Sequence, residues 1–247
     1  MHAASLNEAA AAGCLYLANW DKLFSSSFAD AGAASASEHD EVVLADPMCG
    51  SGTFLIEAAL MASNTAPGLY RKWWPFMHWY DFEEQAWSAA KEEAKASINA
   101  QNLDRCIFYG NDAHKGALQL CMRDVQTARL DRWVKLHHGD CREWKLPKKP
   151  TLVMSNPPWG RRLSLQRNGG DEEGDETSMS WSALGAFLKR EAGGANAYLL
   201  SGEAGATQAL RMRANKKIPL TVGGVNCRLL EYRVFAEKKE EDGLLFS

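Results

Sequence analysis

The sequence has no long hydrophobic run, no strong excess of either charge and no paired cysteines. No apolar stretch approaches the roughly 20 residues that span a membrane, and the N-terminus lacks the basic and then apolar pattern of a signal peptide. Lysine and arginine number 28 against 31 acids, so any polyanion must bind to local patches. The six cysteines form no CxxC pair and no zinc-like spacing with histidine. We therefore expect reduced thiols, no metal centre and no membrane partner, in the cytoplasm or else in an organelle or the nucleus.

Short apolar runs alternate with helical stretches along most of the chain. The first run, 41–46, is too short and too rich in valine for a helix, whereas the stretch 113–129 repeats apolar residues at helical spacing. Strands are predicted over 41–46, 106–112, 133–140, 151–155 and 197–200, helices over 53–62, 113–129 and 181–190, and a final hairpin over 218–235. Alternating strands and helices predict an α/β fold, in which helices cover both faces of a parallel sheet.

The segments outside this pattern are a leading helix, two loops and an insertion. The helix is predicted over residues 5–20, and Ser5 and Glu8 have the spacing of a capping box. The first loop consists mainly of small and polar residues and the second is rich in acidic residues, so neither can bury enough apolar surface to order itself. Flexible loops are expected at 25–37 and 168–178, an insertion at 63–100, and a single domain over 1–247.

A polar residue stands at or just after the end of each of the first four predicted strands. These residues are Asp46, Asp112, Asp140 and Asn156. Because the carboxyl ends of parallel strands share one edge of a sheet, and ligands of such folds bind in the crevice there, the four side chains should converge on one site.

The turn after the first strand favours binding of a small ligand. It runs Asp46, Pro47, Met48, Cys49, Gly50, Ser51, Gly52 and Thr53. Its two glycines allow a sharp bend and a close approach of the ligand, and the next helix offers unpaired N–H groups. Neither a Walker lysine nor the third glycine of the dinucleotide fingerprint follows. Together with Asp112, suited to ribose hydroxyls, and Asp140, suited to an adenine amino group, the turn predicts a site for an adenosine that carries an amino acid.

The most specific motif is Asn156-Pro157-Pro158-Trp159, directly after the apolar residues of the fourth strand. The two prolines fix the backbone and cannot donate hydrogen bonds. The Asn156 carboxamide and the Pro157 carbonyl therefore present two acceptors, which suit an amino group with two hydrogens. Trp159 could stack on the planar ring that bears this group.

These motifs resemble those of the class I amino-methyltransferases, whose catalytic motif is (Asn/Asp/Ser)-Pro-Pro-aromatic. More narrowly they are similar to the bacterial large-subunit ribosomal RNA guanine-N2 methyltransferases. The similarity covers the chain from the first helix to about residue 235. It rests on LADPMCGSGT with IEAA at 44–53 and 56–59, APGL at 66–69, NPPWG with Arg162-Leu163 at 156–163, and CRLL at 227–230.

The resemblance implies a Rossmann-like, seven-stranded sheet with six parallel strands and an antiparallel last strand. It also implies S-adenosylmethionine as cofactor and RNA, most naturally ribosomal RNA, as substrate, with methylation of guanine N2. The implied catalytic residues are Asn156, Pro157 and Trp159. The implied cofactor-binding residues are Asp46, Pro47, Cys49, Gly50, Gly52, Thr53, Asp112, Asp140 and Cys141.

The sequence departs from the family pattern at three points. The family carries an RNA-capturing THUMP domain before the catalytic domain, and no counterpart is found here, so we expect RNA capture by a separate domain or subunit. His114 stands where the family has a second acid, and Trp159 replaces the usual tyrosine. Three alternatives to guanine N2 remain open: methylation of adenine N6 in RNA or DNA, methylation of a protein glutamine, and a non-catalytic scaffold that binds the cofactor.

Basic residues cluster in two places, both predicted to lie near the rim of the crevice. Either they hold the substrate polyanion or they are ordinary solvated charge. The first cluster is Lys145, Lys148, Lys149, Arg161, Arg162 and Arg167, and the second is Arg211, Arg213, Lys216 and Lys217.

Overall fold

A computed structural model describes residues 6–24, 41–159, 172–203 and 205–236 of the chain. Its centre is a seven-stranded sheet of order β3-β2-β1-β4-β5-β7-β6. β7 pairs antiparallel with both β5 and β6, and the other pairings are parallel. Six strands thus run in one direction and the last runs against them, which confirms the predicted Rossmann-like sheet.

The strands and helices follow the alternation read from the sequence. The strands are β1 (Val42–Asp46), β2 (Cys106–Asp112), β3 (Val134–His138), β4 (Leu152–Ser155), β5 (Asn196–Ser201), β6 (Lys216–Val222) and β7 (Val225–Arg233). The helices are α1 (Glu8–Leu17), α2 (Thr53–Ala62), α3 (Glu84–Ala96), α4 (Ala100–Asp104), α5 (Lys115–Thr127) and α7 (Glu172–Glu191), with short 3-10 helices η1 (Asp21–Phe24), η3 (Pro75–His78) and η4 (Ala206–Leu210).

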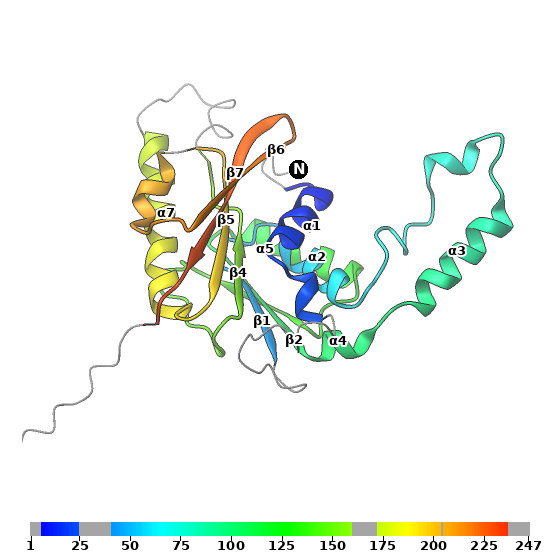
Figure 1. Ribbon diagram of the computed structural model, residues 1–247, viewed down its shortest axis with the longest axis horizontal. Coiled ribbons are helices and arrows are strands. Elements are labelled where there is room, and N and C mark those ends of the chain that lie inside the picture. Colours follow the sequence, from blue (N-terminus) through cyan, green and yellow to red (C-terminus); the bar gives the residue numbers. More distant parts are fainter. Residues whose placement is uncertain (1–5, 25–40, 160–171, 204, 237–247) are drawn as a thin grey trace, which may run out of the picture.

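Helices cover both faces of the sheet (Figure 1). On one face α1, α2 and α5 bury apolar side chains against the strands, among them Leu15, Leu55 and Cys121. On the other face α7 buries Trp181 and Phe187. Apolar area removed from water on both faces stabilises the sheet at roughly 25 cal/mol per Å². The sheet is therefore a rigid support, and its carboxyl edge carries the turns that form the site.

Two helix predictions were wrong in their boundaries. α1 begins at Glu8, after Asn7, whose side chain accepts hydrogen bonds from the backbone N–H groups of Ala9 and Ala10. Asn7 is thus the N-cap, and Ser5 lies outside the described residues. α7 begins at Glu172, so 172–178 is helical rather than a flexible loop. Glutamate has a high helix propensity, so an acidic run alone does not predict a loop. Residues 25–37 and 168–171 lie outside the described part of the chain.

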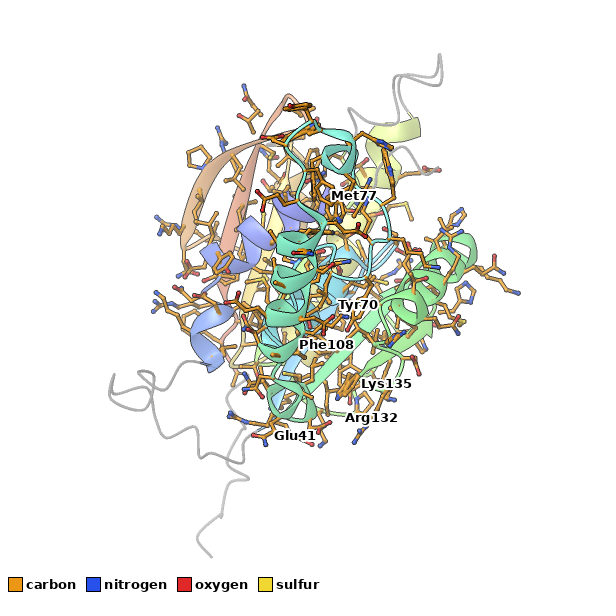
Figure 2. All side chains as sticks on the ribbon, turned by 90° about the vertical axis from the view of Figure 1, so that its right-hand side faces the viewer. Glu41, Tyr70, Met77, Phe108, Arg132 and Lys135 are labelled. Carbon is orange, nitrogen blue, oxygen red and sulfur yellow. The ribbon has the colours of Figure 1, made fainter. Side chains whose placement is uncertain are left out.

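The segment between α2 and α4 forms an arm that projects from the sheet (Figure 1). α3 within it has no buried residue. The arm has a small aromatic cluster of its own, in which Phe76 contacts Trp74, Trp79, Phe82 and Trp87. Viewed along the arm, Met77 and Tyr70 lie in front of the sheet (Figure 2). Aromatic packing therefore holds the arm together, although Trp79 and Tyr80 remain exposed. In the described residues, no helix is both long and apolar enough to cross a membrane.

Candidate active site at the carboxyl edge of the sheet

Two glycines shape the turn between β1 and α2. Gly50 and Gly52 both have positive φ values, 55° and 79°. The N–H group of Gly50 donates to Asp112 Oδ2 at 2.9 Å, and Asp112 Oδ1 accepts from the N–H group of His114 at 2.8 Å. Asp112 at the end of β2 thus holds the glycine turn against its own strand. Each carboxylate oxygen keeps further acceptor capacity for a ligand hydroxyl.

Substitution of Gly52 should destabilise the protein more than the same substitution at Gly50. An alanine at either position adopts a left-handed backbone, at a cost of about 1–2 kcal/mol. A Cβ atom at Gly52 would also lie 2.4 Å from Cys121 Sγ, whereas nothing lies within 4 Å of one at Gly50. Urea denaturation of Gly52→Ala and of Gly50→Ala measures the difference, which we expect to be about 1–3 kcal/mol. Equal free energies of unfolding would contradict this packing of α2 on α5.

Asp46 joins β1 to β4 from within the core. It is 1% exposed, and its Oδ1 accepts from Ser155 Oγ at 2.6 Å and from the Met48 N–H group at 3.1 Å. Burial raises the pKa of Asp46 to about 7, against the opposing effect of these two hydrogen bonds. The resemblance implied that Asp46 binds the cofactor. The structure places the carboxyl inside the core instead, where it positions the ends of both strands.

The pKa of Asp46 makes stability depend on pH in a definite direction. Its pKa is about 7 in the folded chain against an ordinary value of 3.8, so the folded state binds the proton more tightly. The free energy of unfolding should therefore fall as pH rises from about 4 to about 7, because a buried charge must form. In Asp46→Asn this contribution is absent, while the amide oxygen can still accept from Ser155. Urea denaturation between pH 5 and 8 should show a shallower decline for the variant, and parallel curves would rule the effect out.

Asn111, in the penultimate position of β2, connects three strand ends and was not predicted. Its side chain N–H₂ group donates to the carbonyls of Pro47 and Gly139, both at 3.0 Å, and its Oδ1 lies 2.7 Å from His137 Nδ1. Asn111 is 1% exposed. A buried amide in an otherwise apolar strand, one residue before the predicted Asp112, is the signal in the sequence that could have identified it.

A pocket of about 300 Å³ opens beside these turns. Its predicted members are Pro47, Asp140 and Cys141, and its unpredicted members are Met48, Asn111, Ala113, Gly139, Arg142, Glu176, Met179, Ser180 and Ala183. Its lining mixes apolar residues with five polar side chains, so it offers a small ligand both apolar contacts and hydrogen-bond partners. The other predicted cofactor-binding residues are not among its lining residues: Asp46, Cys49, Gly50, Gly52, Thr53 and Asp112.

Asp140 and two buried thiols at this edge of the sheet are already engaged. Asp140 lies two residues beyond β3 and accepts from the backbone and guanidinium of Arg142, which lowers the pKa of its carboxyl. Burial raises the pKa of the Cys141 thiol to about 12. Cys49 shares a hydrogen bond with Cys121, and this bond together with burial raises the pKa of Cys49 well above its ordinary value. These thiols stay protonated and serve as small apolar groups.

The Asn-Pro-Pro-Trp motif follows β4, one residue beyond the link between Ser155 and Asp46. Among the described residues, Asn156 Oδ1 is buried and has no hydrogen-bond partner. The Pro158 carbonyl accepts from the indole N–H of Trp181 at 3.1 Å, so α7 holds the second proline in place. Trp181 was not predicted as part of the site. A buried acceptor without a donor costs about 1–3 kcal/mol, and such groups are found where a ligand supplies the missing partner.

Trp159 faces the core rather than the crevice. Its indole N–H donates to the Leu200 carbonyl on β5 at 3.1 Å, and only 3% of the residue is exposed. A Cβ atom on Gly202 would lie 2.3 Å from the indole ring. The predicted stacking on a substrate base needs an open ring face, which this position does not offer. We correct the role of Trp159 to that of an anchor, which fixes the motif on β5.

The described part of the first basic cluster lies at the opposite edge of the sheet from the site. Lys148 forms an ion pair with Glu41, which precedes β1, so this part of the cluster is at the amino ends of the strands. Figure 2 labels Glu41, Arg132 and Lys135 at the lower end of the view. Arg161, Arg162 and Arg167 lie outside the described residues. The second cluster, with Arg211, Arg213 and Lys217, lines a separate groove.

The carboxyl edge thus combines a glycine turn, acidic acceptors, a small pocket and a rigid acceptor motif. Within the described part of the chain, no group of three or more His, Cys, Asp or Glu side chains could hold a metal ion. A seven-stranded sheet with this order and one antiparallel strand, and with this edge, defines the Rossmann-like class I methyltransferase fold.

Comparison with known proteins identifies the family. Residues 23–231 match the family described as RMKL-like, methyltransferase domain. The chain is 37% identical over 196 residues to the ribosomal RNA large subunit methyltransferase K/L of Vibrio cholerae, covering 77% of this chain and 26% of that protein. It is 33% identical over 200 residues to the protein of the same name from Shewanella sediminis, covering 79% and 27%. The chain belongs to the RMKL-like methyltransferase domain family.

A solved structure of similar fold is that of a possible methylase from Clostridium difficile 630. It has a TM-score of 0.72 and 24% sequence identity, and the match covers 94% of this chain and 53% of that one. This likeness concerns the fold. The chain spans about a quarter of the length of the two curated relatives.

Proposed function

We propose that this chain transfers a methyl group from S-adenosylmethionine to the exocyclic amino group N2 of a guanine in large-subunit ribosomal RNA. The observation that carries the proposal is the buried, unpartnered Asn156 Oδ1 at the end of β4. An amino group with two hydrogens is the donor that this oxygen and the neighbouring Pro157 carbonyl would accept.

The pocket fits the adenosine part of the cofactor. Met48, Ala113 and Ala183 offer apolar contacts to a planar ring, and Asp140 at the rim offers an acceptor to its amino group. Asp112 lies behind the adjoining glycine turn and would accept from ribose hydroxyls. The N-terminus of α2, with Gly52 as its N-cap, would attract the carboxylate of the amino-acid part.

The chemistry that these residues must support is the alignment of an amine for displacement. The bound cofactor supplies an activated methyl group on a sulfonium. The lone pair of an exocyclic amine is delocalised into its ring, so the amine is a poor nucleophile. Acceptance of its two hydrogens by Asn156 Oδ1 and the Pro157 carbonyl favours a pyramidal nitrogen whose lone pair points at the methyl group. Holding the two partners in line then lowers the barrier without a strong base.

The choice of ribosomal RNA and of guanine rests on the family. The two relatives are named ribosomal RNA large subunit methyltransferase K/L, and the motifs at 44–53 and 156–163 resemble those of guanine-N2 enzymes. A guanine in a duplex must leave its stack to reach a motif at the sheet edge, whereas a base in a loop is accessible. Because the chain spans a quarter of these relatives, we also propose that RNA capture involves a further domain or subunit.

Loss of the Asp112 carboxylate should weaken cofactor binding more than loss of the Asp140 carboxylate. Asp112→Ala removes the acceptor for the Gly50 N–H group as well as the proposed ribose contact. The Asp140 carboxylate already accepts a hydrogen bond from Arg142, so it has less capacity to bind the cofactor. We expect about a 10-fold to 100-fold rise in Kd for S-adenosylhomocysteine, since hydrogen bonds to a charged group contribute about 1.5–3 kcal/mol. Calorimetric titration of both variants gives the comparison. Equal affinity of wild type and Asp112→Ala for S-adenosylhomocysteine would show that Asp112 does not contribute to cofactor binding.

The function itself is tested by transfer of a radiolabelled methyl group. The chain is incubated with labelled cofactor and, separately, bulk RNA, DNA and protein, and the labelled product is digested and separated. We expect label in N2-methylguanosine from ribosomal RNA. Label in N6-methyladenine or methylglutamine would overturn the choice of substrate, and cofactor binding without label in any fraction would support the scaffold alternative.

A further inference from the structure

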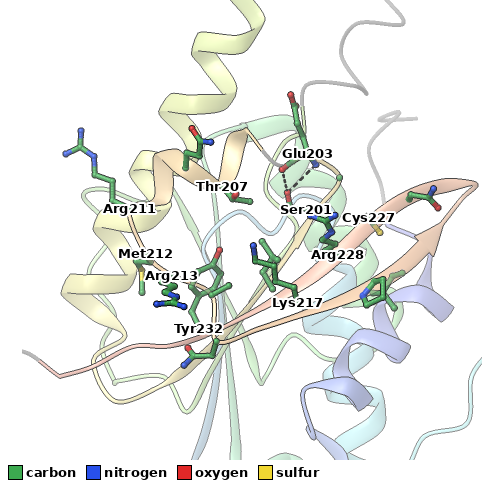
Figure 3. A pocket seen from close by; sticks show the side chains of 18 of the residues that line it. Ser201, Glu203, Thr207, Arg211, Met212, Arg213, Lys217, Cys227, Arg228 and Tyr232 are labelled. Atoms are coloured by element: carbon green, nitrogen blue, oxygen red, sulfur yellow. Dashed lines mark hydrogen bonds between the residues drawn. The ribbon is translucent and has the colours of Figure 1, made fainter.

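A groove lined by several basic side chains lies over β6 and β7. It is on the α7 side of the sheet, in a part that α7 does not cover. Its volume is about 1350 Å³. The floor is made by β6 and β7, and one wall by η4 and the chain after it (Figure 3). A Cβ atom on Gly185 of α7 would lie 2.4 Å from the Leu210 carbonyl, so α7 and η4 pack closely. The groove is therefore a built feature of the fold.

The strand register places two cations side by side on the groove floor. Lys217 pairs with Leu230 and Pro219 pairs with Arg228, so these residues point to the same face of the sheet. Lys217 and Arg228 are diagonal neighbours, a position from which long side chains reach each other. Figure 3 shows both extending into the groove, with Arg213 beside Tyr232 and Arg211 turned away.

Within the described residues, the basic side chains of the groove face little opposite charge. Arg213, Lys217 and Arg228 are exposed and form no ion pair among the described residues. Glu203 is the single acid in the lining. The chain as a whole carries a net charge of -3, so this local excess of positive charge is not a general property of the surface. Neighbouring like charges on a sheet face repel each other, and a polyanion laid across them would relieve the repulsion.

The groove reaches the carboxyl edge of the sheet next to the Asn-Pro-Pro-Trp motif. Ser201 and Gly202 line its end, and Gly202 lies directly against the Trp159 indole. Trp159 is also bonded to the Leu200 carbonyl of the same strand. A chain of phosphates in the groove would therefore end one strand away from Asn156.

We propose that this groove holds the phosphate backbone of the RNA strand next to the target base. Arg213, Lys217 and Arg228 contact phosphates, and Ser201 and Gly202 mark the end at which the strand turns towards the active site. The proposal rests on the proposed function for the identity of the polyanion. The groove gives affinity and register without reading sequence, as phosphate contacts do.

The test compares two triple variants that lose the same charge. The groove variant is Arg213→Gln with Lys217→Gln and Arg228→Gln. The control is Arg123→Gln with Arg132→Gln and Lys135→Gln, on α5 and at β3, far along the sheet from β6. The probe is a labelled single-stranded 20-nucleotide RNA of mixed sequence, titrated at several salt concentrations. Titration with S-adenosylhomocysteine checks that both variants keep the cofactor pocket.

The expected result is a smaller salt dependence in the groove variant alone. At a slope of about 0.7 per phosphate contact, the loss of three contacts lowers the log–log slope by about 2. From 50 to 200 mM salt the wild type should lose about 20-fold more affinity than the groove variant. If the groove variant is poorly folded, each single substitution should lower the slope by about 0.7. Equal slopes in the groove and control variants would overturn the proposal.

Failure of the groove and failure of the proposed function give different results. The binding titration involves no methyl transfer, so a reduced slope supports the groove even if guanine is not the acceptor. Conversely, methylation of bulk ribosomal RNA with the same kcat/KM in wild type and groove variant, together with an unchanged slope, overturns the groove and leaves the proposed function standing.

Discussion

Asn156→Ala should lower the rate of methyl transfer about a hundredfold to a thousandfold and leave cofactor affinity nearly unchanged. Loss of one aligned hydrogen-bonding group in a desolvated site costs about 2–4 kcal/mol of barrier, by analogy with the deletion of an oxyanion-hole donor. The pocket beside β1, β2 and β3 does not include Asn156, so the cofactor keeps its contacts. Single-turnover methylation of RNA, together with calorimetric titration of S-adenosylhomocysteine, measures both quantities.

The stability of this variant distinguishes a functional residue from a structural one. Asn156 Oδ1 is buried without a partner in the described structure, so its removal breaks no hydrogen bond of that oxygen. Removal of an unsatisfied buried acceptor is neutral or stabilising. We therefore expect Asn156→Ala to unfold at the same urea concentration as wild type or a higher one. A large loss of stability would indicate a structural role instead.

Asn156→Asp is the matched variant for the chemistry. Aspartate keeps an acceptor oxygen in the same place and occurs in the (Asn/Asp/Ser)-Pro-Pro-aromatic motif that this sequence resembles. It should retain much more activity than Asn156→Ala. If both variants methylate RNA at the wild-type rate, the motif does not act on the amino group, and the scaffold alternative gains support.

The sheet could be predicted from its short apolar runs and from the alternation of strands and helices along the chain. Short apolar runs predicted β1 and β2 at nearly their observed bounds, because a strand buried on both faces reads as a continuous apolar segment. The antiparallel direction of β7 came from the family resemblance, whereas its place between β5 and β6 was not predicted. Helix starts were less predictable, since Asn7 and Ser5 are both good N-caps and tertiary packing decides between them.

The site was predictable in its location and less so in the direction of its side chains. Polar residues at strand ends correctly predicted a common edge, because parallel strands end together. That the Asp46 carboxyl turns inward to Ser155, and that the Trp159 indole turns inward to Leu200, depends on contacts between residues 41 to 109 positions apart. Spacing within a motif contains no information about such contacts. Asn111 was missed for the same reason, since its partners come from two distant segments, the turn after β1 and the end of β3.

Trp159→Ala should lower the free energy of unfolding by about 3–5 kcal/mol, the usual cost of removing a buried tryptophan. The indole is 3% exposed, packs against Gly202 and donates to Leu200, so the variant leaves a cavity and an unpaired carbonyl beside β5. Trp159→Phe fills most of the cavity and should cost less, mainly the roughly 1 kcal/mol of the hydrogen bond. Urea denaturation of both variants gives these values. A tryptophan that stacks on the substrate base would behave differently: Trp159→Ala would raise KM for RNA and keep the wild-type stability. That outcome would show that the indole faces the crevice and would overturn its role as the anchor of the motif.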